Sequence, residues 1–148
     1  MASLGRAWHG FRQLSWTDRG LAGRAWVLLF LAATGLRMMG FRRTQAAVGS
    51  IEPDAHGRRD LTEAMVVARI VHAAANHHVL QPNCLVRSMV LVRMLRLRGL
   101  DAELRIGVAT PHGRFAAHAW VEHAGVALAE PSPPSGSYGP FDEAWLTR

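Results

Sequence analysis

A chain of 148 residues, 49% of them hydrophobic and 19% charged, is long enough for one folded domain and too apolar to be intrinsically disordered. Its single cysteine excludes an internal disulfide, so we expect a reducing, cytoplasmic location. The net charge of +6 lies entirely in the first third, because residues 1–50 contain seven Arg and one acid, whereas residues 51–148 contain ten of each. This basic third lacks a recognisable nucleic-acid-reading motif, so we expect no nucleic-acid partner.

The basic N-terminal third predicts helices, with Ser15 or Thr17 as a cap. Its uninterrupted apolar stretch, residues 25–36, is shorter than the roughly 20 residues that span a bilayer. The 24 residues before it are longer than the usual basic region of a signal peptide, so we favour packed or surface-bound helices over a signal peptide. We therefore divide the chain into a basic helical segment, residues 1–50, and a core domain, residues 51–148. The segment is expected to pack on the following helix, or to dock on acidic partners or on anionic lipid at the inner membrane face.

Pro, Gly and charged residues predict a linker at residues 49–60. A helix then begins at Asp60 or Thr62. Its apolar residues recur along one face at Leu61, Met65, Ala68, Val71 and Ala75. Three histidines lie near its end: His72, His77 and His78. They lack the i, i+4 spacing of a helical metal site, so we expect neither a metal nor a cofactor.

Residues 83–100 predict a strongly apolar helix that begins at the only cysteine, Cys84. Its buried face is expected to carry Leu85, Met89, Val92, Leu95 and Met94. Gly99 stands where a left-handed C-terminal cap belongs, and Arg87 and Ser88, one turn into the helix, are expected to be structural. A cysteine at a helix N-terminus is either a buried structural residue or a nucleophile, because the helix dipole and the unpaired N–H groups favour the reactive thiolate.

After Gly99 the apolar pattern changes to a period of two and predicts strands at 102–108, 115–122 and 126–130. The Pro-rich tail, residues 131–140, is expected to be a surface loop. A three-residue hairpin loop, 123–125, would place His118 directly opposite Glu130 on one face of the sheet. A two-residue loop, 124–125, would place them on opposite faces. The glycine at position 125 favours the three-residue loop.

Together these residues predict an α+β fold in which a nucleophile helix packs on a small antiparallel sheet, behind the N-terminal helices. Cys84, His118 and Glu130 are then the nucleophile, the base and the residue that orients the base in a cysteine hydrolase. Read singly, His118 is as easily a core histidine and Glu130 a surface acid. The oxyanion would be held by the Cys84 backbone N–H and by a side-chain amide, either Gln81 or Asn83.

The sequence also resembles a known family, the lasso-peptide maturation peptidases of the transglutaminase-like, papain-related superfamily. Five motifs carry the resemblance, in order: Cys84-Leu-Val-Arg-Ser88, Leu95-Arg-Leu-Arg-Gly99, Arg105-Ile-Gly-Val108, Ala117-His-Ala-Trp-Val-Glu122 and Gly139-Pro-Phe141. The resemblance covers roughly residues 60–141 and implies catalytic roles for Cys84 and His118. The family's acidic residue, usually Asp, falls on Glu130, with Asp142 as the alternative acid.

This resemblance implies a stand-alone leader peptidase that cuts the leader from a precursor peptide before the macrolactam ring forms. It also implies two protein partners, a separate leader-recognition protein and an ATP-dependent lasso cyclase. Two other functions fit the same residues. One is a transglutaminase-type or amidase-type enzyme that transfers the acyl group to an amine, and the other is a non-catalytic basic scaffold.

Overall fold

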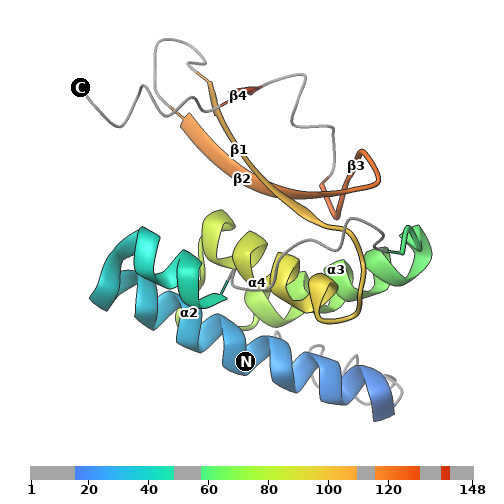
Figure 1. The fold of residues 1–148 in the computed structure, drawn as a ribbon. Helices are drawn as coiled ribbons and strands as arrows, with labels where there is room; N and C mark the ends of the chain where they lie inside the picture. Colours follow the sequence, from blue (N-terminus) through green and yellow to red (C-terminus); the bar gives the residue numbers. More distant parts are fainter. Residues whose placement is uncertain (1–15, 49–57, 110–115, 131–137, 141–148) are drawn as a thin grey trace.

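The computed structural model describes residues 16–48, 58–109, 116–130 and 138–140 (Figure 1). The helices are α2 (Trp16–Val48), α3 (Leu61–Asn76) and α4 (Cys84–Arg96), and the strands are β1 (Glu103–Ala109), β2 (Ala116–His123), β3 (Val126–Ala127) and β4 (Gly139–Pro140). Within these ranges, α4 lies between the other two helices and an antiparallel sheet (Figure 1). The predicted α+β class, with the helix that begins at Cys84 packed on a small antiparallel sheet, is confirmed.

Helix α2 has apolar residues on all sides, and its inner side packs on α3 and α4. The buried residues of this side are Leu21, Ala25, Leu29, Ala32 and Ala33. The helix bends at Gly40, whose φ of 75° and ψ of 176° are costly for residues with a side chain. Packed N-terminal helices are therefore confirmed from Trp16 onward. Residues 1–15, with the proposed Ser15 cap, and residues 49–57 of the proposed linker lie outside the described residues.

The ends of α3 and α4 follow from local capping. The Asp60 side chain accepts a hydrogen bond from Glu63 N over 3.0 Å and begins α3, as predicted. Gly99 has a φ of 68°, and its N–H donates to Arg96 O over 2.9 Å. Leu100 N donates to Leu95 O over 3.1 Å, which completes a Schellman motif after α4.

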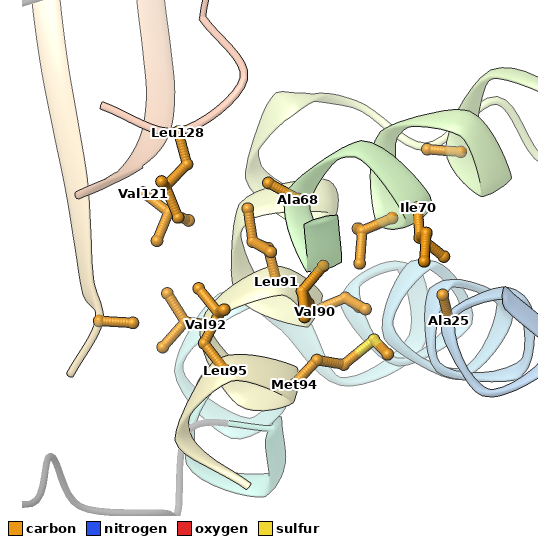
Figure 2. Close-up of a cluster of buried hydrophobic side chains, with 14 of the residues drawn as sticks. Ala25, Ala68, Ile70, Val90, Leu91, Val92, Met94, Leu95, Val121 and Leu128 are labelled. Atoms are coloured by element: carbon orange, nitrogen blue, oxygen red, sulfur yellow. The ribbon is translucent and has the colours of Figure 1, made fainter. Parts of the chain in front are cut away.

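The hydrophobic core is centred on α4, which contacts α2 and α3 on one side and the sheet on the other (Figure 2). Because it is covered on both sides, α4 buries eight of its thirteen residues: Val86, Ser88, Met89, Val90, Leu91, Val92, Met94 and Leu95. Leu85, which belongs to the predicted buried face, is only half-buried. The predicted face of α3 is partly wrong, since Leu61 is 39% exposed and Met65 is only partly buried. Ala64, Val67 and Ile70 are buried instead, because α3 packs on two helices rather than one. This core is continuous across residue 50, and the proposed domain boundary there stays a prediction.

The sheet has the strand order β3-β2-β1-β4 among the described residues, and its hairpin differs from the favoured prediction. The loop after β2 has two residues, because His123 pairs with Val126 and Glu122 pairs with Ala127. Both loop residues have positive φ, 51° at Ala124 and 78° at Gly125, as a tight hairpin turn requires. The favoured three-residue loop, 123–125, which would pair Glu122 with Val126, is therefore wrong.

The segments that follow the hairpin turn also differ from the prediction. Strand β3 ends at Ala127 instead of continuing to Glu130. Part of the expected surface loop forms β4, which pairs with β1 at Gly107 and Val108. Backbone pairing, which the Pro-rich composition of the tail does not reveal, holds this short strand at the edge of the sheet.

Candidate active site

A pocket of about 310 Å³ lies where the N-terminus of α4 meets α3, β2 and the segment after β3. Its lining residues are His72, Pro82, Asn83, Cys84, Arg87, Ser88, His118, Ala119, Ala129 and Glu130. The three residues predicted as nucleophile, base and orienting acid therefore line one pocket, although they are up to 46 positions apart in the chain.

Cys84 is the first residue of α4 and is half-buried. Asn83 caps the helix, and its Oδ1 accepts from Val86 N over 3.0 Å. The Cys84 N–H stands in the first turn, where backbone donors have no acceptor within the helix. The pocket therefore contains a thiol next to backbone groups that can bind a negative charge.

Arg87 holds the segment that leads into Cys84. Its Nε donates to Pro82 O over 2.9 Å, and its Nη1 donates to Asn76 Oδ1 over 3.0 Å. One side chain thus joins the end of α3, the connection and the first turn of α4. Because these bonds fix the residues directly before the thiol, Arg87 sets the position of Cys84.

Ser88 joins the same helix to the sheet. It is 6% exposed, and its Oγ donates to Ala119 O over 2.9 Å. Ala119 follows His118 on β2, so this buried bond sets the distance between the helix that carries the thiol and the strand that carries the imidazole. The expectation that Arg87 and Ser88 are structural agrees with both sets of contacts.

His118 and Glu130 are in contact, as predicted, although the three-residue hairpin loop from which we predicted this contact does not form. His118 Nε2 lies 3.2 Å from Glu130 Oε2, with side chains 26% and 16% exposed. In the observed register a continued β3 would place Glu130 opposite Ala119, on the other face from His118. Ala129 instead has a φ of 56°, so the chain leaves the strand and carries Glu130 back to the imidazole.

This contact defines the roles of the two imidazole nitrogens. Because a carboxylate only accepts hydrogen bonds, Nε2 is the nitrogen that donates to Glu130, and Nδ1 takes no part in this contact.

Two aromatic rings lie beside His118. Trp120, two residues further along β2, is stacked at 6.0 Å between ring centroids, and Tyr138 is tilted at 5.6 Å. Gly107, which pairs with His118 across β1 and β2, makes room for them. A Cβ at Gly107 would lie 2.7 Å from Tyr138 Cβ and 2.9 Å from the Trp120 ring. The glycine therefore allows two aromatic side chains to support the imidazole.

His72 is a second imidazole in the pocket, from α3. Burial lowers the pKa of His72 below its usual 6.5, Arg87 lowers it further, and Glu130 opposes the shift. His72 is consequently uncharged at neutral pH. Glu130 therefore lies close enough to act electrostatically on His72 as well as to contact His118.

The remaining predicted residues are divided between the pocket and the surface. Of the two amides, Asn83 lines the pocket, whereas Gln81 is exposed, has a φ of 43° and is not among the described residues of the lining. Asp142 lies outside the described residues. No group of His, Cys, Asp or Glu suited to a metal ion occurs in the described ranges.

Sequence reasoning missed His72 and the two aromatic residues. Trp120 was detectable, because alternate residues of a strand share a face and it lies two positions after His118. Gly107 within a strand also indicates a close approach. No local pattern connects Tyr138 or His72 with this pocket.

A family model described as the transglutaminase-like superfamily matches residues 26–141. The match contains every residue of the pocket lining and most of α2. In comparisons with curated proteins and with solved structures, nothing matches the chain.

Proposed function

The chain belongs to the transglutaminase-like superfamily, and we propose that it is a cysteine peptidase that removes the leader from a lasso-peptide precursor before macrolactam formation. One observation carries the enzymatic part of this proposal. The cysteine at the start of α4 lines the same pocket as a histidine whose Nε2 is 3.2 Å from a carboxylate oxygen. A nucleophile, a base and an orienting acid are the elements that cysteine-dependent acyl transfer needs.

In the proposed reaction, the Cys84 sulfur attacks the carbonyl carbon of the last leader residue. His118 Nδ1 takes the thiol proton and delivers it to the leaving amine, and Glu130 holds the ring and offsets the positive charge that it gains. Water then attacks the thioester, which frees the leader as a carboxylate and returns the thiol.

The oxyanion of the tetrahedral intermediate would be bound by the Cys84 N–H and by Asn83 Nδ2. Asn83 is preferred over Gln81 because it lines the pocket and its amide is held by the helix cap.

The precursor specificity rests on the sequence motifs. Cys-Leu-Val-Arg-Ser and Ala-His-Ala-Trp-Val-Glu resemble those of lasso-peptide maturation peptidases, and the contacts of Arg87, Ser88 and Trp120 give these motif residues a function around the site. A separate leader-recognition protein and an ATP-dependent lasso cyclase are the proposed partners. The cytoplasm, where precursor and ATP are present, is the proposed location.

Intact-mass analysis of a lasso-peptide precursor tests this function. The protein is incubated with the precursor, with and without the leader-recognition protein. The expected products are the leader and the core peptide, with one added water. Cys84→Ala should abolish both products while the melting temperature stays near that of the wild type, because the change removes one half-buried sulfur atom.

An added primary amine distinguishes the second candidate function. The same site transfers the acyl group to an amine if water is excluded from the thioester, so a product that gains the amine instead of water would identify an acyltransferase. Cleavage by the Cys84→Ala variant at the wild-type rate would refute the assignment of Cys84 as the nucleophile. Absence of both products with every partner present would refute the leader-peptidase function.

A further inference from the structure

The outer side of α2 is an exposed apolar surface that the catalytic site does not use. Its large apolar residues are Trp16, Trp26, Val27, Phe30, Leu31 and Met38. At 3.6 residues per turn they fall on one broad face, opposite the side that packs on α3 and α4. Val27 and Leu31 are 54% and 57% exposed, which is unusual for neighbouring apolar side chains on a globular protein. Figure 1 shows α2 on the far side of the helical layer from the sheet.

Positive charge borders this face. Arg24 and Arg37 are exposed near its two edges, and Arg42 and Arg43 follow the bend at Gly40. None of these four side chains has an ion-pair partner among the described residues. The only acid of α2, Asp18, is half-buried. An apolar face bordered by guanidinium groups matches an anionic bilayer surface, where apolar side chains enter the acyl region and cations reach the headgroups.

The helix meets the length and hydropathy of a membrane span, since an 18-residue window within Trp16–Ala47 has a mean hydropathy of 1.3, and 28% of that window is buried. Spanning would nevertheless remove Leu21, Ala25 and Leu29 from the core and place Arg24 in hydrocarbon. Lying in the interface keeps the inner contacts and inserts only the outer face. We propose that α2 docks this protein on an anionic lipid surface, with its axis parallel to the bilayer and the catalytic pocket accessible from the water.

Vesicle co-sedimentation of the full chain tests this docking. Vesicles of phosphatidylcholine mixed with phosphatidylglycerol should bind the protein, and vesicles of phosphatidylcholine alone should bind it less. Val27→Glu and Leu31→Glu should each lower the partition coefficient about tenfold or more, because each replaces inserted apolar surface with a charge. Val126→Glu is the matched control, since Val126 is 42% exposed on the β2–β3 hairpin, and it should bind as the wild type does.

Melting temperature and sedimentation velocity distinguish lipid from the other possible occupants of the outer face of α2, which are another part of this chain and a second copy of it. An exposed face predicts that Val27→Glu leaves the melting temperature and the monomer mass unchanged. A lower melting temperature would show that another part of this chain covers the face, and a dimer that Val27→Glu dissociates would assign it to a second copy. Either result, or equal binding of Val27→Glu and wild type to the vesicles, would overturn the lipid proposal. Binding that persists only with an acidic protein partner would overturn it as well.

Discussion

Replacing Glu130 with Gln tests how the carboxylate acts on His118. The new side chain is nearly isosteric with the old one, and its amide oxygen can still accept a hydrogen bond from His118 Nε2, which now lies 3.2 Å from a carboxylate oxygen. The substitution removes only the negative charge that offsets the imidazolium. Turnover is therefore expected to fall roughly 10²–10⁴-fold, as when the acid of a Cys- or Ser-dependent triad is neutralised.

The same substitution should change the free energy of unfolding by about 1 kcal/mol or less, because a neutral hydrogen bond replaces a charge-assisted one. Single-turnover cleavage of the precursor measures the fall in turnover, and urea denaturation measures the change in the free energy of unfolding. Glu130→Asp, which keeps the charge, should retain substantial activity. If Glu130→Gln cleaved within a few-fold of the wild-type rate, the reasoning would be refuted, and Asp142→Asn would then test the alternative acid.

The other predictions concern the residues around the pair. Ser88→Ala removes the donor to Ala119 O in a buried site, so urea denaturation should show a loss of about 1–3 kcal/mol, and an unchanged midpoint would contradict a structural role for this bond. Gly107→Ala should displace the rings beside His118 and slow turnover about tenfold or more by the loss of alignment, whereas Gly20→Ala, which meets nothing within 4 Å, should not slow it. The pKa of His72 is lower in the folded protein than in the unfolded chain. Below pH about 6.5 the unfolded chain therefore binds a proton at His72 more readily than the folded protein does, so the free energy of unfolding decreases as the pH falls. His72→Gln should reduce this slope in thermal melts between pH about 7 and about 5, and an equal slope in both proteins would assign it to another group.

The sequence by itself indicated the helices, two of their ends and the residue types of the candidate site. Asp60 and Gly99 mark helix ends through hydrogen bonds to residues at most five positions away, so a local pattern contains all of the necessary information. The lone cysteine at the start of an apolar helix, followed by a histidine on a strand, likewise indicated a hydrolytic site from residue types and order.

The tertiary structure decided how the acid reaches the histidine. A two-residue turn that contains Ala124 at positive φ and a left-handed Ala129 after β3 are conformations that alanine rarely adopts, so the residue type gave no sign of either. The two-residue turn shifts the hairpin register by one residue, and the left-handed Ala129 then carries the chain out of the strand. Together these two changes bring Glu130 to His118. Packing between distant elements also brings His72 and Tyr138 to the site. Only contacts between residues far apart in the chain carry that information.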